Sequence, residues 1–169
     1  MTEAPQIPDA EATLAALAER MRGAVAFDAA FVGIYSGGAW LAERLPALVP
    51  GNHPVGFIDV SFYRDDYSRI GLKSGVKRTA LPFDVDGATI VLVDDVLYTG
   101  RSVRAAINEL FDFGRPARIE LAVLIDRGGR ELPIEPTYCG ARLSVAHDLS
   151  VVLSRDGERL RLAVEKQAC

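Results

Sequence analysis

The fold of this chain is decided by residues 89–102, which read TIVLVDDVLYTGRS. The run Thr89–Val93 is continuous and rich in β-branched residues, as expected for a parallel strand that is buried on both faces. A helix is predicted to follow, because Ser102 can cap its start and Gly114 its end. The apolar face of this helix comprises Val103, Ile107, Leu110 and Phe111.

A second apolar run, from Ile119 to Ile125, predicts another buried strand after the helix. A strand, a helix and a strand in this order form a right-handed βαβ unit with parallel strands. The sequence therefore predicts an α/β fold, in which helices flank a mostly parallel central sheet and Thr89–Val93 is the central strand.

The chain before this unit predicts a helix, a strand and a second helix. Asp9 can cap the first helix, and its apolar positions recur at helical spacing at Leu14, Leu17, Met21 and Val25. Residues 30–35 form an apolar run typical of a short buried strand. The small residues 36–38 then turn the chain into a helix from about Ala39, which Pro46 should kink or stop.

Three other segments complete the predicted organisation. Apolar and polar residues alternate in part over residues 55–63, which predicts a strand. Residues 64–79 are polar and predict a long exposed loop, which is either a functional lid or a solvated connection. Residues 151–154 and 160–164 flank Asp156-Gly157, which is a hairpin signal and predicts a small antiparallel flap.

Length and composition fit one soluble globular domain. The chain has 169 residues, of which 49% are hydrophobic and 25% charged, and its formal net charge is −4. An acidic chain has no overall attraction to a polyanion, so nucleic-acid binding would require a local basic patch. No apolar run is long enough to span a membrane, and we expect a cytoplasmic protein. Cys139 and Cys169 lack metal-ligand spacing and are expected to be reduced.

The chemistry is expected at the end of the central strand. Ligands of open α/β sheets bind outside the carboxyl ends of the strands, and a helix N-terminus attracts anions. Gly100 allows close backbone approach, and Thr99 and Ser102 add hydroxyl groups, so this loop predicts a phosphate site. Asp94 and Asp95 can accept hydrogen bonds from a ribose diol or reach Mg²⁺.

Other phosphate-binding motifs are missing from the sequence. The loop lacks the spacing and the lysine of a Walker P-loop, and no Gly-x-Gly-x-x-Gly follows a strand, which disfavours an NTPase and a dinucleotide oxidoreductase. His53 and His147 have no evident acidic or metal partner and are predicted to be surface or structural residues.

Residues 90–102 resemble the phosphoribosyl-pyrophosphate (PRPP) signature of type I phosphoribosyltransferases. The surroundings resemble the PyrR family in three places: DVSFYRDD at 59–66, FGRP at 113–116 and LIDRGGRELPI at 124–134. The resemblance runs from roughly residue 10 to 165. PyrR proteins are pyrimidine operon regulators and uracil phosphoribosyltransferases.

The resemblance implies a type I phosphoribosyltransferase domain over residues 1–169, with a flexible loop at about 64–80 and a hood at about 127–165. It implies PRPP, uracil, UMP and pyrophosphate as ligands, Mg²⁺ held mainly through PRPP, and a homodimer or larger homo-oligomer. Asp94 and Asp95 would hold the ribose hydroxyls as catalytic residues. The other implied substrate-binding residues are Ser36, Gly37 and Gly38 at pyrophosphate, Arg64, the loop Val96, Leu97, Tyr98, Thr99, Gly100, Arg101 and Ser102 around the ribose phosphate, Arg127, and Val151 near the base.

Two departures from the family pattern affect the expected function. Residues 35–38 contain no cation, whereas relatives often carry a basic sequence such as Lys-Thr-Arg-Gly there, so slower catalysis is expected and a cation must come from elsewhere. Glu135 and Ala141 occupy positions where relatives commonly carry a basic residue in the surface that binds messenger RNA. Because each lost phosphate contact weakens RNA binding, a reduced RNA role is expected.

Three functions therefore remain open at this point. The favoured one is a uracil phosphoribosyltransferase that makes UMP and pyrophosphate. The alternatives are a UMP-sensing, RNA-binding regulator of pyrimidine gene expression with weak or vestigial catalysis, and a phosphoribosyltransferase that acts on another base.

Overall fold

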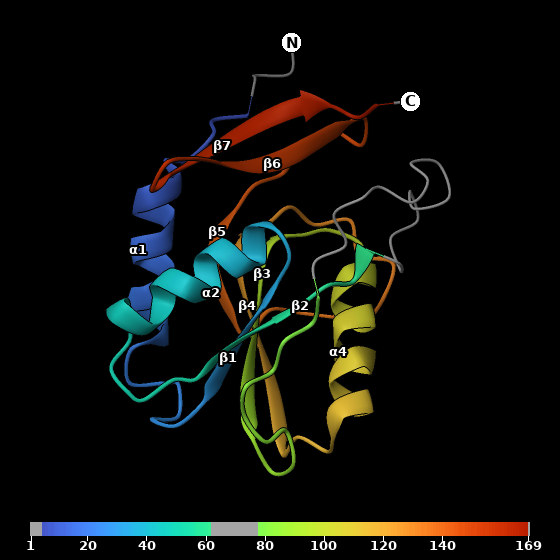
Figure 1. The fold of residues 1–169 in the computed structure, drawn as a ribbon. Coiled ribbons are helices and arrows are strands. Elements are labelled where there is room, and N and C mark those ends of the chain that lie inside the picture. The colour runs from blue at the N-terminus through green and yellow to red at the C-terminus, as the bar shows by residue number, and fades with distance from the viewer. Residues whose placement is uncertain (1–4, 62–77, 169) are drawn as a thin grey trace.

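The core of the molecule is a five-stranded parallel sheet in the order β2-β1-β3-β4-β5. The computed structural model describes residues 5–61 and 78–168 (Figure 1). The strands are β1 (Ala30–Ile34), β2 (Val55–Ile58), β3 (Thr89–Leu97), β4 (Arg118–Asp126) and β5 (Tyr138–Arg142). The predicted α/β fold with Thr89–Val93 in the central strand is confirmed.

Helices cover both faces of this sheet. Helices α1 (Ala10–Met21) and α2 (Gly37–Leu48) pack on one face, and α4 (Arg101–Phe113) packs on the other (Figure 1). Val91 and Val93 belong to the first core cluster, whereas Ile90 and Leu92 belong to the second. Successive side chains of a strand point to opposite faces, so a central strand covered on both sides must be apolar throughout.

A two-stranded antiparallel hairpin lies over one end of the sheet (Figure 1). It consists of β6 (Leu149–Asp156) and β7 (Arg159–Lys166), and we call these two strands the hairpin. Val151, Leu153 and Leu160 of the hairpin are buried in the core cluster of α1 and α2. The predicted flap is confirmed, although its connecting residues are 157–158, one position later than the Asp156-Gly157 signal.

The structure corrects several predicted boundaries. Helix α2 begins at Gly37 and not at about Ala39, and it contains Pro46 in its last turn. Helix α1 ends at Met21, so Val25 packs against the core from outside the helix. The strand predicted over residues 55–63 ends at Ile58.

Helix α4 and strand β5 also differ from the sequence-based prediction. The residue that precedes α4 is Gly100 and not Ser102, and Phe111 is 53% exposed and not part of the buried face. Strand β5 was not predicted from the sequence, although it lies within the segment expected for the hood. Within the described residues, no helix combines the length and the apolar character that crossing a membrane requires.

Candidate functional site

The two acids Asp94 and Asp95 lie on β3 itself and not in the loop after it, because this strand continues to Leu97. The Asp94 Oδ1 accepts a hydrogen bond of 2.9 Å from the Asp95 N–H, and the Asp95 Oδ1 accepts one of 2.8 Å from the Val96 N–H. As neighbours on a strand, the two side chains point to opposite faces of the sheet. Asp95 is half-buried beside α2, whereas Asp94 is only 5% exposed.

The first turn of α2 lies directly against Asp95. A Cβ atom on Gly37 would lie 2.7 Å from the Asp95 Cγ, and one on Gly38 would lie 3.1 Å from the Asp94 Cα and still closer to the Val93 carbonyl oxygen. Real Cβ atoms do not approach so closely, so a Cβ at position 38 would collide with the β3 backbone, and one at position 37 would displace the Asp95 side chain. The helix start at Gly37 and Gly38 thus reaches the strand end, which brings the positive end of the helix dipole beside Asp95.

The β3–α4 loop, residues 98–100, forms the third part of the site. Gly100 has a φ of +92°, a conformation that favours glycine. The Thr99 Oγ1 accepts a 3.2 Å hydrogen bond from the N–H of Arg101, and the Thr99 carbonyl accepts bonds from the N–H groups of Glu131 and Leu132. Val96 and Leu97, predicted as loop residues, belong to β3, whereas Arg101 and Ser102 belong to α4.

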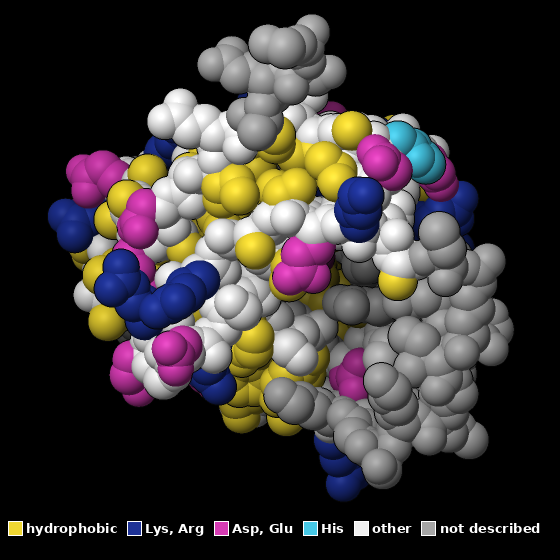
Figure 2. Space-filling view, turned by 90° about the horizontal axis from the view of Figure 1, so that it is seen from above, with side chains coloured by type: hydrophobic (Ala, Val, Ile, Leu, Met, Phe, Trp, Pro, Cys, Tyr) yellow, Lys and Arg dark blue, Asp and Glu magenta, His cyan; other side chains and the backbone are white. Residues whose placement is uncertain are grey.

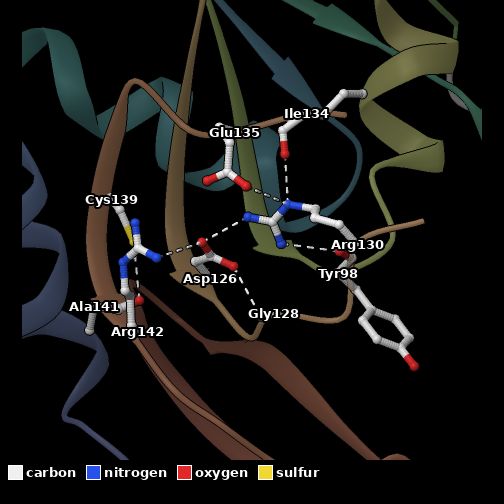
Figure 3. Close-up of polar contacts among 9 residues, drawn as sticks. All are labelled: Tyr98, Asp126, Gly128, Arg130, Ile134, Glu135, Cys139, Ala141 and Arg142. Atoms are coloured by element: carbon white, nitrogen blue, oxygen red, sulfur yellow. Dashed lines mark hydrogen bonds and ion pairs between the residues drawn. The ribbon is translucent and has the colours of Figure 1, made fainter. Parts of the chain in front are cut away.

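Arg130 fixes this loop from the segment that follows β4 (Figure 3). Its guanidinium donates to the Tyr98 carbonyl at 3.1 Å, to the Asp126 Oδ2 at 2.8 Å and to the Ile134 carbonyl at 2.7 Å. The ring of Tyr98 points away from this network (Figure 3). The loop backbone is therefore held in place by Arg130, for which the sequence did not predict this role.

Asp126 is the buried anion that holds Arg130. Burial alone would raise the pKa of the Asp126 carboxyl, but hydrogen bonds from Arg130 and the Gly128 N–H, with the charges of Arg130 and Arg142, outweigh it and lower the pKa. The carboxylate therefore stays charged at neutral pH. In the sequence, this ion pair could have been inferred from an acid and a base spaced four residues apart, Asp126 and Arg130, directly after an apolar run.

Arg127 and Val151 connect the site to the hairpin. The guanidinium of Arg127 lies 3.8 Å from the centre of the Tyr98 ring and donates to the Leu149 carbonyl at 2.7 Å. Val151 follows two residues later on β6 and is buried. Arg64 and most of the expected loop at about 64–80 lie outside the described residues.

The two histidines and the two cysteines were not predicted to take part in catalysis. His53 is buried, stacks on Phe31 and lies within hydrogen-bond distance of the Ala29 carbonyl, so its role is structural. His147 is exposed. Cys139 is buried with a free thiol whose pKa burial raises, while Cys169 is not among the described residues.

The oxygen donors at the end of β3 suit a hard cation such as Mg²⁺ better than a soft one. Across residues 5–61 and 78–168, no cluster of three or more His, Cys, Asp or Glu side chains could enclose a metal by itself. The described side chains would therefore supply few of the ligands of an Mg²⁺ bound here. This donor set fits a metal that arrives with a polyphosphate substrate.

Comparison with known proteins identifies relatives over most of the chain. The phosphoribosyl transferase domain model matches residues 4–145. The Bifunctional protein PyrR of Ralstonia nicotianae is 54% identical over 154 residues, which cover 89% of this chain and 88% of the relative. The protein of the same name from Pseudomonas aeruginosa strain LESB58 is 53% identical over 123 residues, which cover 73% of this chain and 72% of the relative.

Solved structures share the fold at low sequence identity. A hypoxanthine-guanine phosphoribosyltransferase from Bacillus anthracis superposes with a TM-score of 0.64 at 15% identity and covers 87% of this chain and 86% of its own. A hypoxanthine phosphoribosyltransferase from Staphylococcus aureus gives a TM-score of 0.61 at 19% identity, covering 83% of this chain and 77% of its own. At such identities the likeness is one of fold alone.

Proposed function

Because the chain belongs to the PyrR family of phosphoribosyl transferase domain proteins, we propose that it is a uracil phosphoribosyltransferase that makes UMP and pyrophosphate from uracil and PRPP. The observation that carries the proposal is the convergence of Asp95, the glycine start of α2 and the β3–α4 loop at one end of the central strand. This arrangement places carboxylate oxygens, which can accept hydrogen bonds from ribose hydroxyl groups, beside N–H groups that can bind phosphate. A ribose that bears phosphate groups requires both.

In the reaction, N1 of uracil attacks the anomeric carbon of PRPP. The bond from that carbon to the pyrophosphate oxygen breaks, the carbon–nitrogen bond forms, and the N1 proton is lost to solvent. The sugar passes through an oxocarbenium-like state, so positioning and electrostatics do most of the work and no enzyme nucleophile is needed. Mg²⁺ bound to the pyrophosphate would neutralise charge on the leaving group.

We assign the residue roles on the same basis. Asp94 and Asp95 accept hydrogen bonds from the ribose hydroxyls and orient the anomeric carbon. The N–H groups of Thr99, Gly100 and the first turn of α4 bind the ribose phosphate. The start of α2 faces pyrophosphate, where backbone N–H groups replace the cation that residues 35–38 lack.

We also propose that residues 1–169 form one catalytic domain, that it works as a homodimer or larger homo-oligomer, and that it acts in the cytoplasm.

Regulation of pyrimidine genes through a leader RNA is the second activity of the family. Figure 2 shows Lys and Arg side chains interspersed with Asp and Glu on the described part of the face above the hairpin, not gathered into one basic patch.

The segment after β4 supports a reduced role in RNA binding. Arg130 is engaged by Asp126 and lies 3.7 Å from Glu135, and Arg127 is buried, whereas Arg142 is 74% exposed. Few of these cations are free to neutralise RNA phosphates, so we rank catalysis above an RNA-binding function. Salt-dependent binding of a pyrimidine-operon leader RNA, without catalytic turnover, would reverse that order.

The test is UMP formation from PRPP, Mg²⁺ and radiolabelled uracil, with orotate and hypoxanthine as parallel substrates. Turnover specific for uracil supports the proposal, and turnover with another base instead would replace it.

Asp95→Asn should lower kcat by about tenfold to a hundredfold, because the ribose loses a charged acceptor. Its matched control is Asp112→Asn on the exposed side of α4, which should stay within about twofold of the unchanged protein. Equal activity of the two variants would remove Asp95 from the mechanism.

A further inference from the structure

Arg127 joins the β3–α4 loop to the hairpin through one side chain. Its guanidinium stacks on the ring of Tyr98, 3.8 Å from the ring centre. The same guanidinium donates to the carbonyl of Leu149, the first residue of β6, at 2.7 Å, and to the carbonyl of Ala146 at 3.4 Å. The backbone N–H of Arg127 donates to the Leu97 carbonyl, so Arg127 is also tied to the end of β3.

The geometry around Tyr98 leaves its ring little room to move. A Cβ atom on Gly129 would lie 2.5 Å from the Tyr98 Cε2, so the Gly129 backbone packs closely on the ring that the Arg127 guanidinium also contacts. Gly129 has a φ of +82°, which favours glycine at this contact. Tyr98 is thus held at its ring by Arg127 and at its carbonyl by Arg130.

Burial makes the Arg127 contacts stronger than those of a surface arginine. The residue is 8% exposed, and its Nε is buried without a hydrogen-bond partner among the described residues. A buried guanidinium that lost its two carbonyl acceptors would leave a charge without compensation. The guanidinium is therefore engaged by the Tyr98 ring and by two carbonyl groups at the start of β6 and just before it.

We propose that Arg127 is a positioning residue, which couples the β3–α4 loop to the base side of the site by holding Tyr98 and the start of β6 together. The functional part of this inference rests on the proposed function, in which the loop binds the ribose phosphate. A base attached to that ribose extends away from the phosphate, β6 contacts β3, and Val151 near the start of β6 is buried. Arg127 thereby sets the distance between the phosphate subsite and the hairpin without touching the reacting atoms.

The coupling itself is tested without any ligand, by amide hydrogen exchange of the full chain. Arg127→Met keeps the length of the side chain and removes the charge. Exchange should accelerate by about tenfold in both residues 98–100 and residues 149–151, because each loses its contact with the guanidinium. The matched control is Arg155→Met on the same hairpin, which removes an arginine 5.0 Å from the Trp40 ring and should leave residues 98–100 unchanged. Unchanged exchange in either segment of Arg127→Met would overturn the coupling.

The functional consequence is tested by calorimetric binding of UMP and of ribose 5-phosphate. In Arg127→Met, the affinity for UMP should fall by about tenfold more than that for ribose 5-phosphate, because both ligands use the loosened loop and only UMP also reaches the hairpin. Adding Tyr98→Leu should cause little further loss of UMP affinity, because the stack is already gone. Equal losses for the two ligands, or fully additive losses in the double variant, would refute the positioning role. If the unchanged protein binds neither ligand while the exchange result holds, the proposed function fails and the coupling stands.

Discussion

Glu11 holds α1, α2 and the hairpin together, and its replacement gives a prediction whose size follows from the structure. The two Glu11 carboxylate oxygens pair with the Arg44 guanidinium on α2 at 3.0 and 2.6 Å. The Glu11 Oε1 also accepts a 2.8 Å hydrogen bond from the N–H of Leu160 on β7. These contacts, the Arg44 hydrogen bonds foremost, lower the pKa of Glu11 from 4.5 to about 2.

The pKa shift sets an upper limit for the stabilisation. Each pKa unit corresponds to about 1.4 kcal/mol, so the shift of Glu11 gives at most about 3 kcal/mol. The side chains of Glu11 and Arg44 are 31% and 36% exposed, and screening by solvent reduces the contribution. We therefore expect Glu11→Gln to lower the free energy of unfolding by about 2 kcal/mol at pH 7.

The sign of the pH dependence follows from the lowered pKa. The folded state keeps Glu11 ionised while the unfolded state takes up a proton near pH 4.5, so the stabilisation is complete above that pH and is lost as the pH falls toward 2. Urea unfolding of the unchanged protein and of Glu11→Gln, measured between pH 3 and 7, should show their difference shrinking by about half or more at pH 3.

The control for this experiment is Glu19→Gln on the same helix. Glu19 lies 3.5 Å from Arg22, and the two side chains are 74% and 53% exposed, so its loss should cost less than about 0.5 kcal/mol. A difference for Glu11→Gln that is no larger than that of Glu19→Gln, or that stays constant from pH 3 to 7, would refute the reasoning.

Two further predictions concern the start of α2 and the packing of β4 against β5. Gly37→Ala should lower the rate of UMP formation by about tenfold or more in steady-state kinetics, because the added Cβ displaces Asp95; an unchanged rate would mean that this contact does not position the acid. Tyr138→Phe should cost about 1–2 kcal/mol in urea unfolding, because the buried Glu120 loses a 2.9 Å hydrogen bond. Burial and Glu120 raise the pKa of Tyr138 to about 12, so the unchanged protein should lose stability between pH 10 and 12 more steeply than Tyr138→Phe, and parallel alkaline profiles would contradict this.

Local sequence was sufficient for the elements that carry a strong periodic or continuous apolar pattern. The run Thr89–Val93 predicts a central strand because a strand covered on both faces admits only apolar residues, and β3 is that strand. The hairpin was predictable for a related reason, since two apolar segments flank a turn that contains Gly157.

Strand β5 could not be predicted because its sequence carries no such pattern. Residues 138–142 read YCGAR, and they form a strand because β4 offers an open edge and α1 covers them. Gly140 fits there because a Cβ atom would lie 2.6 Å from the Leu124 carbonyl oxygen. The pairing partner, and not the local sequence, determines this element.

The sequence alone determined the α/β fold class, the central strand with Asp94 and Asp95 at its end, and the family to which the chain is similar, because these depend on residue type and short-range spacing. The tertiary structure alone decided which distant residues meet. It sets Gly37 against Asp95, and it commits Arg127 to Tyr98 and the hairpin. Such contacts form only when the whole sheet is assembled, since each depends on the packing of elements that are far apart in the chain.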